Sequence, residues 1–160
     1  LVGGGYPGSQ LYFVDGNLAD YSADFAAGLV EGAKGTLPGL DTSSLGDFTD
    51  RLLAIDPDLT DFSYAAESYD AVVLLALAAL AANSTAGADI ASKLQEVSGG
   101  SGNGEKATDF KSAATIINAG GVVDYDGYSG GIKFDDAGDP TEATIGIFQY
   151  DAMNNHKRIN

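Results

Sequence analysis

The alternation of apolar and polar positions predicts strands and helices in turn along the first part of the chain. Residues 10–14, QLYFV, are aromatic and β-branched, as is typical of a strand, and residues 18–33 follow with a helical pattern. Two glycines and a proline within residues 34–44, KGTLPGLDTSS, indicate a short strand or crossing segment and then a loop. This region therefore predicts a βα order.

The middle of the chain is predominantly helical in pattern. Helices are expected at residues 46–54, 64–83, 88–97 and 107–119. The interior of the second of these is nearly all Ala, Leu and Val, so protein must cover most of its circumference. Its longest apolar run has 12 residues, short of the roughly 20 that span a bilayer. We therefore expect a buried helix there.

The last part of the chain has the pattern of strands and turns. SGGSGNGEK, residues 98–106, predicts a turn or a flexible excursion. Residues 122–140, VVDYDGYSGGIKFDDAGDP, predict a strand, a glycine-rich turn and a second strand. Residues 143–153, ATIGIFQYDAM, alternate as a final strand. Together with the helices, these strands place the chain in the α/β class.

Composition and charge narrow the classes of partner. The chain has 160 residues, about one ordinary domain, and 44% of them are hydrophobic, enough to fill a core of that size. The formal charge of −15 repels phosphate backbones, which excludes nucleic acid as a partner. The acids are spread along the chain, as on a solvated surface suited to a salty or extracellular setting. The absence of cysteine excludes disulfides, thiol chemistry and Cys-based zinc sites.

Two motif matches are better explained by turns. GGGYPG, residues 3–8, fits the spacing G-x-G-x-x-G of a dinucleotide loop, but only two residues precede it where that motif needs a strand. Asp124, Asp126 and the acids of residues 135–139 lack the order of ligands in a calcium loop. We expect a loop in the first case and hairpin turns in the second.

Residues for catalysis are scarce. The only histidine, His156, stands in the polar tail NNHKRIN, where we expect an exposed residue and not a metal ligand or a triad member. With no cysteine and no serine-centred elbow, little is left for nucleophilic chemistry. The sequence therefore predicts a protein that is not an enzyme and that uses no cofactor and no metal.

Residues 11–151 resemble the C-terminal part of type I periplasmic substrate-binding proteins. The stretches that carry the resemblance, in the same order and spacing, are LYFVDGN, GLVEGAKGTLPG, FSYAAESYDAVVLLALAALA and VDYDGYSGGIKFDDAGDPTEATIGIFQYD. The family includes the leucine/isoleucine/valine-binding receptors of branched-chain amino acid ABC transporters. The helix ESYDAVVLLALAA and the hairpin YDGYSGGIKFDDAGDP are its most specific pieces.

The resemblance implies a bilobed α/β protein with Rossmann-like parallel sheets, whose lobes close on a small ligand. Residues 1–38 and 140–160 would form part of the second, C-terminal lobe, and residues 39–139 part of the first, N-terminal lobe. The upstream half of the parent protein would lie outside this chain. The implied location is periplasmic or extracellular, with an upstream N-terminus able to serve as a membrane anchor.

The implied function is that of an extracellular solute-binding component of an ABC transporter, which recognises an amino acid or a similar small polar solute. Its partners would be that solute, such as an amino acid or amide, the permease, and either the missing N-terminal half or another copy of the chain. The last of these would cover the apolar helix at residues 64–83. The alternative is a structural or surface-assembly protein that reuses the fold without binding a ligand.

Asp15 is the first candidate ligand-binding residue. Taken by itself, an acid followed by glycine at the end of a strand favours a turn. In the proteins that the chain resembles, an acid at this place faces the cleft and accepts a hydrogen bond from the ammonium group of the ligand. Many relatives carry Glu there, so the shorter Asp15 leaves room for a water-mediated contact.

Two aromatic residues complete the predicted site. Relatives place an aromatic side chain against the ligand five residues before the position of Tyr69, which in this chain is Tyr64. Phe62 is the candidate if the register differs by two residues, and a residue that begins the helix and covers the core is the alternative for Tyr64. Tyr69 and Asp70 are interpreted as packing and as helix polarity.

Overall fold

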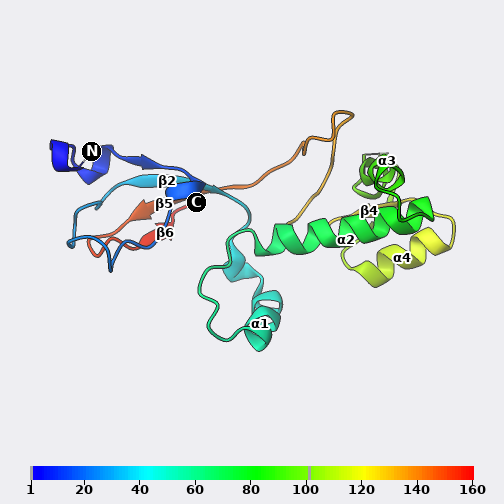
Figure 1. Cartoon of the computed structure of the whole chain (residues 1–160), viewed down its shortest axis with the longest axis horizontal. Helices are drawn as coiled ribbons and strands as arrows, with labels where there is room; N and C mark the ends of the chain where they lie inside the picture. Colours follow the sequence, from blue (N-terminus) through cyan, green and yellow to red (C-terminus); the bar gives the residue numbers. More distant parts are fainter. Residues whose placement is uncertain (1, 101) are drawn as a thin grey trace. The chain divides into compact units, whose positions relative to one another are not determined.

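The computed structural model describes residues 2–100 and 102–160 of the chain. By internal contacts the chain divides into two compact units, labelled by element in Figure 1. Unit 1 comprises Leu1–Asp41 and Thr144–Asn160, and unit 2 comprises Thr42–Ala143. The assignment of these parts of the chain to two lobes of a larger protein stays a prediction.

Unit 1 is built on a four-stranded mixed sheet in the order β1-β2-β5-β6. Its strands are β1 (Tyr12–Phe13), β2 (Lys34–Pro38), β5 (Ile145–Tyr150) and β6 (His156–Arg158). β1 is parallel to β2, and the other two pairs are antiparallel. The strands predicted near the start, middle and end of this part of the sequence are confirmed. Short 3-10 helices precede and follow β1: η1 (Val2–Gly4), η2 (Gly8–Gln10) and η3 (Asp15–Asn17).

The helix predicted at residues 18–33 is wrong. The segment folds as successive turns over one face of the sheet, where Val30, Ala33 and Tyr150 form the core. Gly28 and Gly32 have φ of 78° and 77°, in the left-handed region that interrupts an α-helix. The apolar spacing that suggested a helix is therefore satisfied by turns that bury alternate residues.

A distant residue holds these turns in place. The amide of Asn154 donates to the carbonyls of Phe25 (3.3 Å) and Ala26 (2.9 Å), and its Oδ1 accepts from the N–H of Val30 (3.2 Å). Asn154 is fully buried and has φ of 65°. Backbone groups that a helix would have paired locally are thus satisfied by a side chain at the other end of the sequence.

Unit 2 consists of helices around a short parallel sheet. Its helices are η4 (Thr42–Ser44), α1 (Gly46–Ile55), α2 (Ala65–Ala82), α3 (Gly87–Val97) and α4 (Phe110–Asn118), and its strands β3 (Glu105–Ala107) and β4 (Val123–Tyr125). α2 packs against α3 and α4, and α4 also packs on both strands. The predicted helices are confirmed, except that the last one begins after β3, at Phe110.

α2 is only partly covered. Val73, Leu74, Leu77 and Ala78 face the core of unit 2, but Val72 is 67% exposed. The expectation of a helix buried around most of its circumference is therefore not met within this chain. By length and composition alone, α2 could also cross a membrane, a test that core helices of soluble proteins pass as well.

The hairpin predicted after β4 forms only in part. Its second strand is reduced to an isolated bridge between Phe134 and Pro140. Asp135 closes the turn, since its Oδ1 accepts from the N–H groups of Ala137 (2.9 Å) and Asp139 (3.0 Å). The turn interpretation of this acidic cluster is confirmed.

His156 is not in an exposed tail as expected. It belongs to β6 and is half-buried, with its ring 5.4 Å from that of Phe148 and 5.7 Å from that of Tyr150. The strand was missed because its polar letters, HKR, are typical of a tail, while its pairing partner β5 supplies the apolar side chains.

Candidate functional site

Asp15 lies where β1 ends and η3 begins, in unit 1. Its Oδ1 accepts from the N–H of Gly16 (2.9 Å), while the N–H of Val14 donates to Oδ1 of Asn17 (2.8 Å). The residue therefore takes part in a turn, as the sequence alone favoured. Its side chain is also exposed, so the carboxylate is accessible to a solute. The two roles do not exclude each other.

Tyr64 and Phe62 lie in unit 2, directly before α2. Tyr64 has φ of 60° and ψ of 9°, a left-handed conformation that bulky residues rarely adopt. The N–H of Ala65 donates to the carbonyl of Phe62 (3.1 Å), so residues 62–65 form a tight turn. Tyr64 is 40% exposed and Phe62 is half-buried.

The backbone of Tyr64 matters because such a conformation costs about 1–3 kcal/mol and persists only where the surroundings enforce it. The N–H of Ser68 in the first turn of α2 donates to the carbonyl of Tyr64 (2.9 Å), and Oδ1 of Asp61 accepts from the N–H of Ser63 (2.9 Å). Strained residues of this kind cluster at functional sites. Sequence reasoning selected Tyr64 through the resemblance, and nothing in the sequence indicated its conformation.

An aromatic cluster fixes the start of α2. Phe48 from α1 is buried and stacks on Tyr128 at 4.5 Å between ring centroids, and Tyr69 meets both rings edge-on at 5.6 and 5.4 Å. The Arg51 guanidinium lies 5.6 Å from the centre of the Tyr69 ring and donates to the Tyr128 hydroxyl (3.2 Å). The packing role expected for Tyr69 agrees with these contacts.

Asp70 was interpreted as helix polarity, and this interpretation is wrong. The side chain is fully buried and accepts from the Tyr125 hydroxyl (2.8 Å) and from both the N–H and the hydroxyl of Ser129 (2.6 Å each). A further bond comes from the N–H of Tyr128 (3.2 Å). One carboxylate thus ties the loop after β4 to α2.

The surroundings of Asp70 are shaped for it. A Cβ atom at Gly127 would lie 1.9 Å from Oδ1 of Asp70, so only glycine fits there. Burial, with the neighbouring Asp70 carboxylate as the next cause, raises the pKa of the Tyr125 phenol. A signal was present in the sequence: Asp70 stands at helical spacing with the buried Val73, Leu74 and Leu77, on the apolar face where an unpaired acid would be costly.

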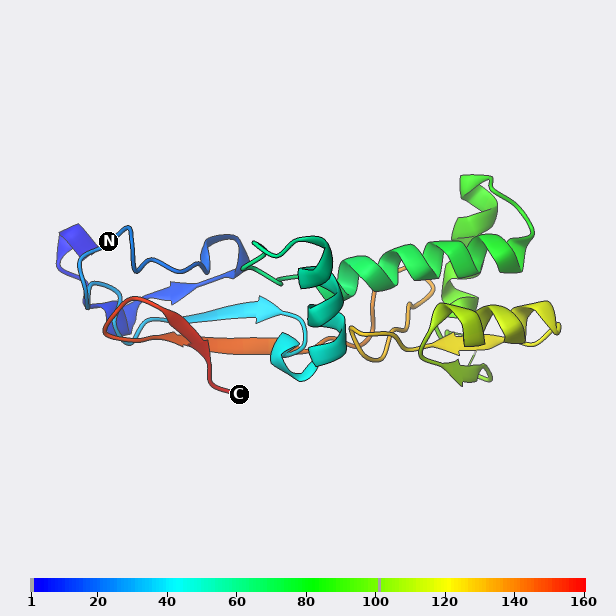
Figure 2. The same cartoon turned by 90° about the horizontal axis from the view of Figure 1, so that it is seen from below.

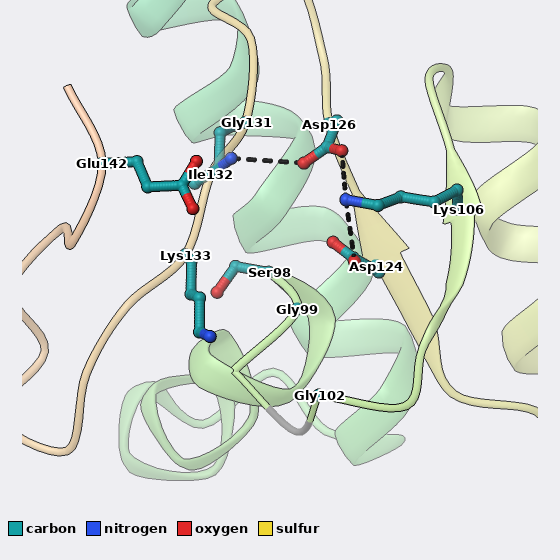
Figure 3. Close-up of a pocket in the computed structure, with 10 residues that line it drawn as sticks. All are labelled: Ser98, Gly99, Gly102, Lys106, Asp124, Asp126, Gly131, Ile132, Lys133 and Glu142. Atoms are coloured by element: carbon teal, nitrogen blue, oxygen red, sulfur yellow. Dashed lines mark hydrogen bonds and ion pairs between the residues drawn. The ribbon is translucent and has the colours of Figure 1, made fainter. Parts of the chain in front are cut away.

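A polar pocket of ≈ 320 Å³ lies elsewhere in unit 2. Figure 3 shows Lys106 of β3 reaching between Asp124 and Asp126, with Nζ 2.9 Å from Asp124 and also bonded to Asp126. These two carboxylates, Asp126 foremost, raise the pKa of the Lys106 ammonium. A Cβ at Gly99 would lie 2.5 Å from Oδ1 of Asp124, so this glycine lets the loop approach the pair.

The pocket is more suited to joining strands than to binding an ion. Lys133 and Glu142 also line it and make no ion pair with another described residue. Both are exposed, whereas the charges of Lys106 and its partners are satisfied internally. Among the described residues, no group of three or more acids or histidines is placed to hold a metal ion.

Comparison with known proteins gives one family. The model of the "Receptor family ligand binding region" matches residues 42–153, well over half of the chain. The match includes all of unit 2, with Phe62, Tyr64 and Asp70, and part of unit 1, but not Asp15. Neither a curated protein nor a solved structure matches the chain.

Proposed function

Because the chain belongs to the family of receptor ligand-binding regions, which have type I periplasmic-binding-like domains, we propose that it is part of an extracellular solute-binding receptor of an ABC transporter. The family is ligand-binding and non-enzymatic, and the mixed α/β architecture agrees with it. The permease of the transporter would be its protein partner. The solute would be an amino acid or a similar small polar molecule such as an amide.

The observation that carries the proposal is the conformation of Tyr64. A partly exposed aromatic residue is held in a left-handed backbone at the start of the longest helix, next to a second aromatic residue, Phe62. Rigid aromatic surfaces are what an apolar side chain of a solute packs against. In this proposal Tyr64 contacts the solute, and Phe62 borders the same surface.

Asp15 would supply the polar selectivity. A carboxylate that accepts from an ammonium group makes a charge-assisted hydrogen bond worth about 1.5–3 kcal/mol. Such a bond distinguishes an amino acid from a plain carboxylic acid. The exposed position of Asp15 at the carboxyl end of β1 supports this role, because open α/β sheets bind ligands beyond the ends of their strands.

Calorimetric titration of the full-length receptor with leucine, valine and glutamine tests the proposal. Asp15→Ala should weaken binding by roughly 2–4 kcal/mol and leave the melting temperature of the ligand-free protein unchanged. Asp58→Ala, at another exposed aspartate in a turn, is the matched control and should change neither quantity. Unchanged affinity of the Asp15 variant would refute its role, and an equal loss of ligand-free stability would favour a turn residue.

Tyr64→Gly tests the aromatic contact in the same titration. Glycine accepts positive φ without strain, so the ligand-free protein should not lose stability while affinity falls by about tenfold or more. If affinity holds, Tyr64 does not touch the solute. The 160-residue chain by itself should show no saturable binding below about 1 mM, since half of the site would be absent.

The alternative is a surface-assembly protein with the same fold and no ligand. Exposed apolar faces on both units favour an assembly role. Absence of binding of every amino acid to the full-length protein would support this alternative and overturn the receptor proposal. Assembly and solute binding are also compatible, and the first of them is developed below.

A further inference from the structure

The sheet of unit 1 has one covered face and one bare face. Phe13 and Tyr150 point into the core that residues 16–33 cover, and side chains alternate along each strand. The opposite face therefore carries the neighbouring residues of each strand, related by the pairing register. They are Tyr12, Val14, Lys34, Thr36, Pro38, Ile145, Ile147, Gln149, Lys157 and Ile159; Figure 2 shows the strands that bear them side by side.

This bare face is apolar at one end and basic at the other. Tyr12 is 79% exposed, Val14 59% and Ile159 53%, and Ile145 and Ile147 are also exposed. Lys34 and Lys157 occupy a single row across the sheet, since both are in register with Gln149. The face has no Asp or Glu, although the chain as a whole carries a charge of −15.

The second bare surface is the outer side of α2. Ser68, Ala71, Val72, Leu75 and Ala76 follow one another at spacings of three and four residues, and all are exposed, Leu75 by 49%. This stripe opposes the side that packs on the core of unit 2. α2 has no Lys or Arg, and Glu67 in its first turn lies beside one end of the stripe.

These two surfaces complement each other. A helix with a smooth apolar stripe is what covers an apolar sheet face in α/β proteins, and the small residues Ala71 and Ala76 permit a close approach. An acid at one end of the stripe matches the lysine row at one end of the sheet face. Within one copy of the chain both surfaces stay exposed, so the match is available only between copies.

We propose that the outer side of α2 of one copy packs on the bare sheet face of a second copy. The contact is heterologous, with different surfaces meeting, and Glu67 of one copy lies toward Lys34 and Lys157 of the other. The helix and the sheet face together remove from water the large exposed apolar residues of both surfaces, the main driving force for association. The proposal does not depend on the identity of the solute or on solute binding.

Light scattering on the purified 160-residue chain tests it. At about 100 µM the chain should have a mass above the 16.3 kDa of one copy. Ile147→Lys on the sheet face and Leu75→Glu on α2 should each weaken association by about tenfold or more, because each places a charge in an apolar contact. Ile55→Lys is the matched control, at an 85% exposed isoleucine that lies on neither surface, and should have no effect.

Mixing the two variants gives the decisive measurement. Ile147→Lys and Leu75→Glu put opposite charges on the two sides of the contact, so the mixture should recover the heavier species that each lacks alone. Far-UV circular dichroism checks that both variants remain folded, and Lys34→Glu with Lys157→Glu, at exposed positions, weakens association without touching the apolar residues. A monomer for the unsubstituted chain, an equal effect of Ile55→Lys, or a mixture that stays monomeric would each overturn the proposal.

Discussion

The two units of the chain rest on different kinds of buried polar anchor. In unit 2 the carboxylate of Asp70 joins α2 to the loop after β4, beneath a core of nine buried apolar residues. In unit 1 the neutral amide of Asn154 joins the turns at residues 25–30 to the end of the chain, over a core of only three buried residues. A large core can hold a buried charge in full contact with its donors, while a small one depends on a polar residue to order its loops.

The largest effect is expected at the charged anchor. Asp70→Ala leaves the buried Tyr125 hydroxyl and the groups of Ser129 without an acceptor, which should lower the free energy of unfolding of unit 2 by roughly 3 kcal/mol. Urea denaturation followed by circular dichroism measures the loss. Asp58→Ala, at an exposed aspartate, is the control. A denaturation midpoint equal to that of the unsubstituted chain would show that the network does not stabilise unit 2.

The neutral anchor should matter less, and only to unit 1. Asn154→Ala removes the acceptor of the Val30 N–H and forces alanine into positive φ, for a loss of roughly 2 kcal/mol. Amide hydrogen exchange at Val30 should accelerate while exchange at Val73 in α2 stays slow. Asn154→Gly separates the two causes, because glycine accepts the backbone conformation but not the hydrogen bonds. Equal acceleration in both units would contradict their independence.

High pH offers a probe of the same charged anchor. Burial raises the pKa of Tyr125, so the folded protein holds this proton more tightly than the unfolded chain does. Stability from this group is therefore complete below the ordinary tyrosine pKa near 10 and declines at up to about 1.4 kcal/mol per pH unit above it. Tyr125→Phe should flatten the decline between pH 10 and 11, whereas Tyr12→Phe, at an exposed tyrosine, should not. An unaltered slope in Tyr125→Phe would remove this tyrosine from the account.

The smallest effect is expected at the surface ion pairs of the polar pocket. Lys106→Met breaks contacts with Asp124 and Asp126 but frees a lysine whose side chain is 66% exposed, so the loss should be about 0–1 kcal/mol and should shrink in high salt. Lys133→Met, in the same pocket but without an ion pair, is the control. A loss as large as that of Asp70→Ala would mean that exposed charges anchor unit 2 as strongly as its buried one.

The periodicity of the sequence was sufficient to predict most helices. α1, α2 and α3 lie within one or two residues of their predicted bounds, because each buries an apolar stripe whose spacing is local. The family also followed from local stretches, and the family model covers the helix and hairpin that carried the resemblance. Asp15, Tyr64 and Phe62 remain predictions as ligand contacts, although the structure adds the conformation of Tyr64 in their favour.

What depended on contacts between distant residues could not be read from local pattern. Residues 18–33 have helical spacing, yet Asn154, more than a hundred positions away, supplies the bonds that make turns the better solution. β6 is polar in sequence and becomes a strand only because β5 lies beside it.

Asp70 shows the same limit most clearly. The sequence places an acid on the apolar face of a helix, but whether that acid is a cost or an anchor depends on Tyr125, Tyr128 and Ser129, which arrive from another part of the chain. Local spacing determines which residues share a face, since that is a property of a few consecutive dihedral angles. Tertiary structure alone decides what that face meets, since the partners of a buried polar group are brought together only when the whole unit folds.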